Sequence, residues 1–296
     1  MGAGAVSEER VYLDYTQAEL DRAYDQRAWA PNADAVIRRY ATESAATRAQ
    51  FKHHYAVAYG PHAEETLDIF PAAQRGAPVH IHVHGGSWRH LSKDDESFLA
   101  RTFVPAGACL MVLNFSTIPA VRLPDMIAQL RRAIAWIHAN AADYGGDPAR
   151  LHLSGHSSGA HMAGVLLHTD WPALGLGLPA DVLKSGLVVS GMYDMRPVMQ
   201  SARSSYVRLS AAEVLELSAI LHIERVRAPL TVVYGGLETP EFQRQAQSFA
   251  AALEAAGKPV KLLRIDGVNH FEILELLGDA ATPLARAALE TMGLRG

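Results

Sequence analysis

The segment "RLHLSGHSSGAHMAG", Arg150 to Gly164, reads as a short strand, a sharp turn and the start of a helix. Residues 155–159 within it are Gly-His-Ser-Ser-Gly, which fits the pattern G-x-S-x-G. Glycines two residues to either side of Ser157 leave room for a tight backbone. The segment therefore predicts a strained strand-to-helix turn with Ser157 at its tip.

A serine in that position points out of the sheet, which makes Ser157 the candidate nucleophile; a plain glycine–serine turn is the alternative. The helix that follows would bring backbone amides and its positive dipole end close to a developing oxyanion. Ser158 is in the wrong register to attack. Its backbone N–H is the expected oxyanion donor.

Strand and helix patterns alternate along most of the chain. Short runs rich in β-branched and aromatic residues are "HYAVAYG", "TLDIFPA", "PVHIHVHG", "ACLMVLNFS", "RLHLSG", "SGLVVSG", "PLTVVYGG" and "PVKLLRIDG". Helical patterns such as "DMIAQLRRAIAWIHANAADYG" separate them from the third run onward. The order predicts an α/β fold with a mostly parallel eight-stranded sheet, helices on both faces, and an antiparallel edge from the first two strands.

The first fifty residues read as helices. "TQAELDRAYDQRAW" begins with Thr16 and Glu19 in capping-box spacing, and Asn32 is the expected cap of a second helix. We expect one domain over residues 1–296, with an N-terminal helical extension at 1–52. The sequence leaves open whether these helices lie over the functional site.

Composition narrows the class of protein. A chain of 296 residues that is 49% hydrophobic and 20% charged is typical of a globular protein. A net charge of −4 without a basic run argues against nucleic acid or an anionic membrane as partner. The single cysteine, Cys109, lies in an apolar run and is expected to be a buried thiol. The start "MGAGAVSEER" lacks a signal-peptide pattern, and no apolar run is long enough to span a membrane, so a cytoplasmic protein is expected.

The loop after the third predicted strand is the expected source of a second oxyanion donor. The strand and loop read "VHIHVHGGSW", Val79 to Trp88. Glycines at the start of the loop allow its backbone to turn an N–H of the Gly86–Ser87 segment toward the substrate oxygen. His84 would brace this loop by hydrogen bonds.

The same stretch allows a metal hypothesis. His80, His82 and His84 alternate along the strand and would therefore line one face. A catalytic zinc site needs a further well-placed ligand, and the sequence names none. A serine mechanism needs no metal or other cofactor, so none is expected.

A nucleophile of this type is followed in the chain by an acid and then a histidine. His270, in "RIDGVNHFEIL", follows the last predicted strand and is the expected base. His222, in "SAILHIERV", is expected to pack or cap within a helical connection.

Three carboxylates compete for the acid position. Glu238 follows the strand "TVVYGG" and occupies the usual place for this element order. Asp194, after "GLVVSG", is the rival, and Asp266 is expected to belong to the end of its own strand. Glu241 reads as a first-turn residue that complements a helix dipole.

Several motifs together resemble one family: "HGGSW", "GHSSGAHMA", "SGMYDMRPV", "ETPEFQRQ" and "NHFEI". They are similar to the arylformamidase (kynurenine formamidase) branch of the α/β-hydrolases and its bacterial carboxylesterase relatives, over about residues 55–275. The resemblance implies the α/β-hydrolase fold and a triad of Ser157, Glu238 and His270. Two positions depart from the family pattern: Glu238 stands where Asp is usual, and Ser87 where an aromatic residue is common.

A short cap at residues 191–229 favours small substrates over triglycerides. Trp88, Met192, Tyr193 and Phe271 neighbour the candidate site and would form an aromatic pocket, or else pack in the core.

The chemistry indicates a serine hydrolase of aryl formamides or small carboxylic esters, with a small-molecule ester or amide as partner. A metal-dependent hydrolase using the histidine strand and a non-catalytic ligand-binding protein are the alternatives. A homodimer is left open.

Overall fold

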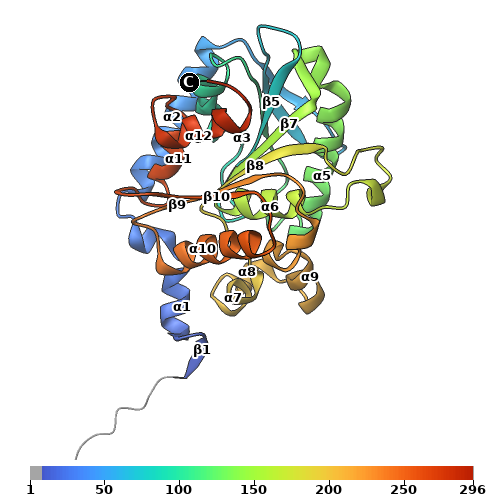
Figure 1. The fold of residues 1–296 in the computed structure, drawn as a ribbon. Helices are drawn as coiled ribbons and strands as arrows, with labels where there is room; N and C mark the ends of the chain where they lie inside the picture. Colours follow the sequence, from blue (N-terminus) through green and yellow to red (C-terminus); the bar gives the residue numbers. More distant parts are fainter. Residues whose placement is uncertain (1–8, 296) are drawn as a thin grey trace, which may run out of the picture.

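Eight strands form one mixed sheet in the computed structural model, which describes residues 9–295 (Figure 1). Each coincides with one of the eight predicted runs. The order across the sheet is β10-β9-β8-β7-β5-β6-β4-β3. Neighbours pair in parallel except β4, which is antiparallel to both β3 and β6, so the predicted antiparallel edge is confirmed. The strands are β3 (His54–Ala58), β4 (Thr66–Phe70), β5 (Ala77–Val83), β6 (Cys109–Leu113), β7 (Gly146–His156), β8 (Leu183–Val189), β9 (Leu230–Gly235) and β10 (Val260–Ile265).

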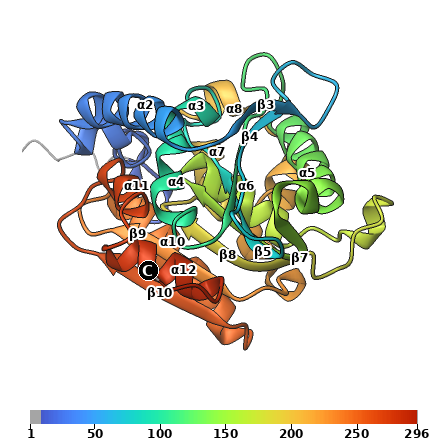
Figure 2. The same cartoon turned by 90° about the horizontal axis from the view of Figure 1, so that it is seen from above.

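Burial explains why these runs are strands. Every residue of β5 and β6 is buried, as expected for central strands covered on both faces, whereas the edge strands β3 and β10 are partly exposed. One apolar layer joins the sheet to α5, α6 and α10, and a second joins it to α2, α4, α11 and α12. Figure 2 looks down on the twisted sheet, with α2, α4 and α11 on one side and α5 on the other.

The helices follow the predicted alternation. They are α1 (Gln17–Ala23), α2 (Ala33–Gln50), α3 (Lys93–Glu96), α4 (Ala100–Phe103), α5 (Leu123–Asn140), α6 (Ser158–Leu167), α7 (Met195–Gln200), α8 (Ser204–Val207), α9 (Ala211–Glu216), α10 (Pro240–Ala255), α11 (Glu272–Leu277) and α12 (Pro283–Thr291). Short 3-10 turns are η1 (Gln26–Trp29), η2 (Ser97–Leu99), η3 (Ala141–Tyr144), η4 (Pro172–Leu174), η5 (Ala219–Leu221) and η6 (Ile223–Arg225).

Parallel strands bring the loops after their carboxyl ends to one edge of the sheet. The loops that follow β5, β7, β8, β9 and β10 therefore converge there. The candidate residues of the sequence analysis lie in these loops.

The N-terminal segment is helical with two differences from expectation. Thr16 and Glu19 form the predicted capping box, but α1 ends at Ala23 because Asp25 caps the separate turn η1. Asn32 precedes α2 without capping it through its side chain. A small hairpin of β1 (Arg10–Tyr12) and β2 (Tyr15–Thr16) was not expected from the sequence.

Residues 1–8, on which the expectation about a targeting signal rests, lie outside the described part of the chain. Within residues 9–295, none of the helices combines the length and the apolarity that crossing a membrane requires.

Buried histidines make the fold sensitive to acid. Burial lowers the pKa of His152 and of His161 to about 4, and that of His168 to about 3, from an ordinary value of 6.5. His168 stacks on His222 with ring centroids 4.6 Å apart. Between about pH 4 and 6.5 the unfolded chain binds protons at these sites that the folded chain does not bind.

We therefore expect the free energy of unfolding to be greatest above pH 6.5 and to fall as the pH drops toward 4. Each such histidine contributes up to about 3 kcal/mol to this loss. Urea denaturation at pH 7, 6 and 5 measures it. His168→Gln should flatten the pH dependence, whereas the exposed control His62→Gln should leave it unchanged. Equal stability at pH 7 and pH 5 would contradict the expectation.

Candidate active site

Ser157 forms the tip of the turn between β7 and α6. Its backbone has φ 56° and ψ −120°, a conformation that residues with a side chain rarely adopt. A Cβ on Gly155 would lie 2.4 Å from the carbonyl oxygen of Gly159, and a Cβ on Gly159 would lie 2.1 Å from that of Val83. Both glycines are therefore required by close backbone packing, and the turn predicted from the sequence is present.

The side chains of Ser157, His270 and Glu238 are hydrogen-bonded in series. Nε2 of His270 lies 2.8 Å from Oγ of Ser157, and its Nδ1 lies 3.1 Å from Oε2 of Glu238. All three residues are buried. When Nδ1–H donates to the carboxylate, Nε2 is free to accept the serine proton. The arrangement can activate a serine hydroxyl for attack.

Glu238 is held rigidly by its second oxygen. Oε1 accepts hydrogen bonds from the backbone N–H of Gly235 at 2.6 Å and from Oγ of Ser190 at 2.5 Å. Ser190 directly follows β8 and has a φ of 58°. Ser190 is not among the residues predicted from the sequence, although its place after the strand beside β7 was a usable signal.

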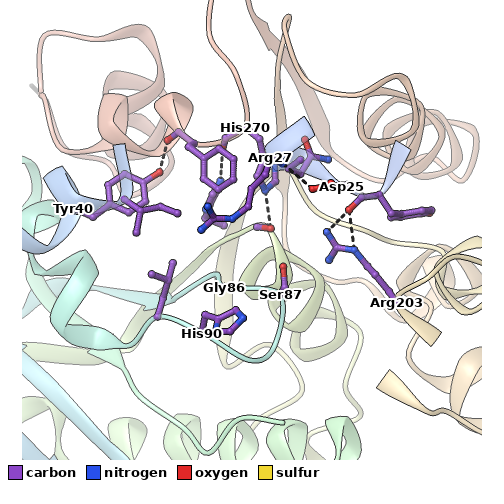
Figure 3. Close-up of a pocket in the computed structure, with 15 residues that line it drawn as sticks. Asp25, Arg27, Tyr40, Gly86, Ser87, His90, Arg203 and His270 are labelled. Carbon is purple, nitrogen blue, oxygen red and sulfur yellow. Dashed lines mark hydrogen bonds between the residues drawn. The ribbon is translucent and has the colours of Figure 1, made fainter. Parts of the chain in front are cut away.

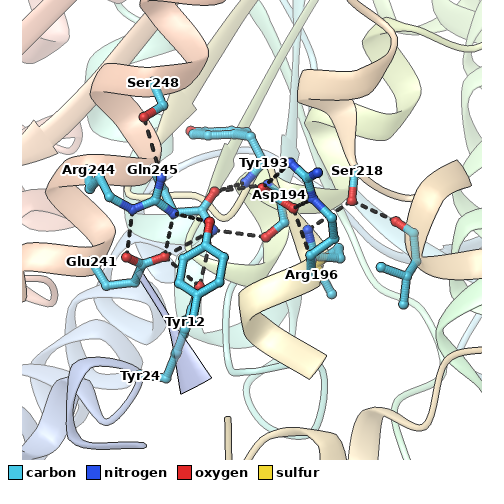
Figure 4. Close-up of polar contacts among 12 residues, drawn as sticks. Tyr12, Tyr24, Tyr193, Asp194, Arg196, Ser218, Glu241, Arg244, Gln245 and Ser248 are labelled. Carbon is cyan, nitrogen blue, oxygen red and sulfur yellow. Dashed lines mark hydrogen bonds and ion pairs between the residues drawn. The ribbon is translucent and has the colours of Figure 1, made fainter. Parts of the chain in front are cut away.

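The two aspartates that competed with Glu238 lie elsewhere in the structure. Asp194 caps α7 and forms a bidentate ion pair with Arg196, with N–O distances of 2.9 and 2.8 Å (Figure 4). Asp266 is exposed and pairs with Arg264 at 2.7 Å. Within residues 9–295, Glu238 is the one carboxylate that contacts the ring of His270.

Glu241 does more than complement the dipole of α10. Its side chain is fully buried and forms an ion pair with Arg244 at 2.7 Å. It also accepts a hydrogen bond from the hydroxyl of Tyr24 at 2.9 Å. Tyr24 in turn accepts from Nε2 of Gln245 at 3.1 Å (Figure 4). This cluster attaches the end of α1 to the helix that follows Glu238.

The loop after β5 carries the expected oxyanion donors. Gly86 has a φ of +105°, and a Cβ there would lie 1.8 Å from the carbonyl oxygen of His90, so only glycine fits. Ser87 also has a positive φ, 55°. Ser158 begins α6, and its Oγ accepts the backbone N–H of Trp88 at 3.2 Å. Ser158 thus attaches this loop to the helix behind Ser157.

His80 and His82 of β5, and His84 directly after it, form hydrogen bonds inside the protein. His80 Nε2–H donates to Oγ of Ser154 at 2.7 Å, and that hydroxyl donates to Nδ1 of His82, also at 2.7 Å. His84 donates to the carbonyl of Gly85 at 2.8 Å, as expected for a residue that braces the loop. Within residues 9–295 no cluster of three or more His, Cys, Asp or Glu side chains is arranged to hold a metal ion.

Glu96 ends this chain of hydrogen bonds beneath the loop that follows β5. Its Oε2 accepts Nε2–H of His82 at 2.5 Å, and its Oε1 accepts the backbone N–H of Gly85 at 3.1 Å. Burial by itself would raise the pKa of Glu96, but the hydrogen bond from His82 and nearby histidines hold it below its ordinary value. The sequence carried no signal for this role.

His156, the residue before Ser157, supports the loop of His270. Its Nε2–H donates to the backbone carbonyl of His270 at 2.8 Å. Burial and the neighbouring His270 lower the pKa of His156 to about 4, so it is neutral at pH 7. The candidate nucleophile and base are therefore linked through backbone as well as side chains.

A cavity of about 340 Å³ opens onto Ser157 (Figure 3). Its lining comes from the N-terminal segment, the loop after β5, the turn that carries Ser157, the cap and the loop that carries His270. The residues are Tyr24, Asp25, Gln26, Arg27, Ile37, Tyr40, Gly86, Ser87, His90, Leu91, His156, Ser157, Arg203, His270 and Phe271. The N-terminal helices thus contribute to the site, which the sequence left open.

The predicted aromatic pocket is only partly present. Phe271 lines the cavity, but Trp88, Met192 and Tyr193 do not. Trp88 is buried and donates its indole N–H to Nδ1 of His161 at 3.3 Å. Met192 and Tyr193 are fully buried, and Tyr193 stacks on an aromatic ring of α10. These three side chains are buried, as the core-packing alternative expects, and none of them lines this cavity.

The N-terminal segment is attached directly to the loop that carries His270. The side chain of Asn32 accepts from Asn269 Nδ2 at 2.9 Å and donates to Glu272 at 2.6 Å, which explains why it does not cap α2. The hydroxyl of Tyr40 donates to the carbonyl of Phe271. Tyr40 therefore both lines the cavity and holds the loop of the candidate base, whereas Asn32 holds that loop without lining the cavity.

Comparison with known proteins agrees with this architecture. The BD-FAE family model matches residues 67–170. The kynurenine formamidase of Danio rerio is 30% identical over 288 residues, which cover 93% of this chain and 96% of that protein. Esterase LipQ of Mycobacterium tuberculosis is 31% identical over 248 residues, covering 77% of this chain and 56% of that protein. The crystal structure of a candidate thioesterase from Silicibacter sp. tm1040 has a TM-score of 0.79 at 24% identity, covers 90% of this chain and 97% of that chain, and supports the fold alone.

The close packing at the turn predicts a severe effect of one added methyl group. Gly159→Ala should destabilise the fold by at least about 3 kcal/mol or displace Ser157, because its Cβ meets the backbone of β5. Gly164→Ala in the same helix is the matched control. Its nearest contact is the Cβ of Ala219 at 3.3 Å, so its stability should change by no more than about 1 kcal/mol. Thermal unfolding measures the stability of both variants. Equal melting temperatures of Gly159→Ala and Gly164→Ala would contradict the expected clash at Gly159.

Proposed function

Because the chain belongs to the kynurenine formamidase family of α/β-hydrolases, we propose that it is a serine hydrolase of aryl formamides or small carboxylic esters. The observation that carries this proposal is the contact of His270 with both Ser157 and Glu238 at the strained turn. The names of two relatives, a kynurenine formamidase and an esterase, support the pair of substrate types.

In the proposed mechanism His270 takes the proton of Ser157 as its Oγ attacks the acyl carbon. Glu238 keeps the imidazole in the correct tautomer and stabilises the imidazolium that forms. His270 then returns the proton to the leaving amine or alcohol, and the acyl group stays on Ser157. Water, deprotonated by the same imidazole, hydrolyses this ester and restores the enzyme.

The negative oxygen of the tetrahedral intermediate would be held by backbone N–H groups of Ser158 and of the Gly86–Ser87 segment. All lie beside Ser157, and α6 starts at Ser158, so its positive dipole end faces the same point. Hydrogen bonds from the backbone N–H of Gly85 to Glu96 and from that of Trp88 to Oγ of Ser158 hold the loop before the reaction begins. Such preorganised donors need not rearrange when charge develops.

The cavity supports small substrates. Its volume of about 340 Å³ is at the lower end of ligand pockets. Ile37, Tyr40 and Phe271 supply apolar lining suited to an aryl group. A formyl or short acyl group on an aryl leaving group fits these dimensions.

The central test is Ser157→Ala. The variant should fold like the native protein and lose hydrolysis of N-formyl aryl amines and of p-nitrophenyl esters of rising chain length. An organophosphonate should label the native protein at Ser157 alone. Ser158→Ala keeps the nucleophile, and its hydrolytic activity should fall by a smaller factor. The variant loses only the hydrogen bond that Oγ of Ser158 accepts from the Trp88 N–H. Full activity without Ser157, or labelling elsewhere, would overturn the proposal.

The acid is tested by comparing variants of Glu238 with a variant of Asp194, its rival for the acid position. Glu238→Gln should reduce kcat by several orders of magnitude, since removing a triad carboxylate typically costs about 10⁴-fold. Glu238→Asp should keep partial activity, because the shorter side chain reaches His270 less well. Asp194→Asn is the control, since Asp194 pairs with Arg196 instead. A large loss in Asp194→Asn together with an active Glu238→Gln would reverse the assignment.

A further inference from the structure

Arg203 is a buried cation in the wall of the catalytic cavity. It lies in the cap between α7 and α8 and is only 8% exposed, yet it lines the cavity beside Ser157. Among residues 9–295 no carboxylate lies within ion-pairing distance of its guanidinium. An arginine buried to this degree normally has a carboxylate partner, because an uncompensated buried charge is costly.

The contacts that Arg203 does make leave part of its guanidinium free. Nε and Nη2 donate to the backbone carbonyl of Tyr24 at 3.1 and 2.6 Å, and Nη1 lies 4.0 Å from the sulfur of Met192. The guanidinium carbon lies 5.8 Å from the ring centroids of Tyr24 and Trp88, and 5.9 Å from that of Phe242. Aromatic faces and one carbonyl stabilise a cation, but they do not neutralise it. The remaining N–H groups have no partner among residues 9–295.

Arg203 lies between two cavities. A second cavity, of about 590 Å³, shares Arg203, Ser87 and His90 with the first, so the two meet at this residue. Asp25 also lines both cavities, but its carboxylate caps the turn η1 by accepting the N–H of Arg27 at 3.1 Å. Arg203, which donates to the carbonyl of Tyr24, lies on the same side of the cavity as Asp25 (Figure 3).

We propose that Arg203 binds a carboxylate of the substrate, outside the bond that is cleaved. The inference rests on the proposed hydrolase function and names a specificity determinant for it. A planar guanidinium can donate two parallel hydrogen bonds to a carboxylate, and charge-assisted bonds of this kind are among the strongest that side chains form. Aryl esters and formamides that carry a carboxylate on the ring are the preferred class.

The test uses substrates that differ in one group. 4-Acetoxybenzoate is compared with its neutral isostere 4-acetoxybenzamide, and 4-formamidobenzoate with 4-formamidobenzamide, together with the 3-substituted isomers. The native enzyme should prefer the carboxylate member of a pair by about 10- to 100-fold in kcat/KM. Arg203→Gln should remove the preference, so that the ratio of kcat/KM within each pair falls close to 1. Arg203→Lys should restore part of the preference.

Arg225→Gln is the matched control, because Arg225 is an exposed cap arginine and the charge change is the same. The preference of the Arg225→Gln variant for the carboxylate substrate should equal that of the native enzyme. Equal turnover of acid and amide by the native enzyme, or an equal loss for both substrates in Arg203→Gln, would overturn the inference; the second result would mean that Arg203 only attaches the cap to Tyr24.

A binding measurement separates this inference from the hydrolase proposal. Benzoate should raise the melting temperature of the native protein and of Ser157→Ala, whereas benzamide at the same concentration should not. Arg203→Gln should lose the benzoate effect. Benzoate binding without hydrolysis of any substrate would contradict the proposed function but support the anion site. Hydrolysis without benzoate binding would support the proposed function but contradict the anion site.

Discussion

The contact between the first turn of α6 and strand β5 is the constraint on which the site depends. With Gly159 directly against the backbone of β5, the chain has no room for an ordinary loop between β7 and α6. Ser157 therefore adopts its strained conformation, and the next residue already belongs to the helix. The strain is a cost to stability that the surrounding packing must offset. In return, the serine hydroxyl and the first amide of α6 lie beside the same small volume.

Two buried glutamates near this turn make the same kind of contacts. Glu238 binds His270 with one oxygen and the backbone N–H of Gly235 with the other. Glu96 binds His82 with one oxygen and the backbone N–H of Gly85 with the other. Each carboxylate thus fixes a ring and a backbone segment at once. One orients the proposed base, and the other holds the proposed oxyanion loop, so the two halves of the proposed chemistry are positioned independently.

The sequence was informative where local pattern determines structure. All eight strands follow from short apolar runs, and the order of Ser157, Glu238 and His270 along the chain follows from the order of strands. It was uninformative where a side chain chooses between distant partners. Trp88 borders the oxyanion loop, yet its ring turns away to His161, which lies on α6. Asn32 looked like a helix cap but bonds to Asn269 and Glu272. Such choices depend on how α2 and the cap dock, which periodicity does not encode.

The wall of the cavity is made by segments that do not belong to the sheet. Tyr24 and Tyr40 come from the N-terminal segment, and Arg203 comes from the cap. Arg203 donates to the carbonyl of Tyr24, so these two segments hold each other in place over the strained serine. Substitutions in them can alter which substrates fit without moving the turn or its glutamates. The division follows from the fold: close backbone packing preserves the chemistry, and side chains on peripheral segments are free to set its specificity.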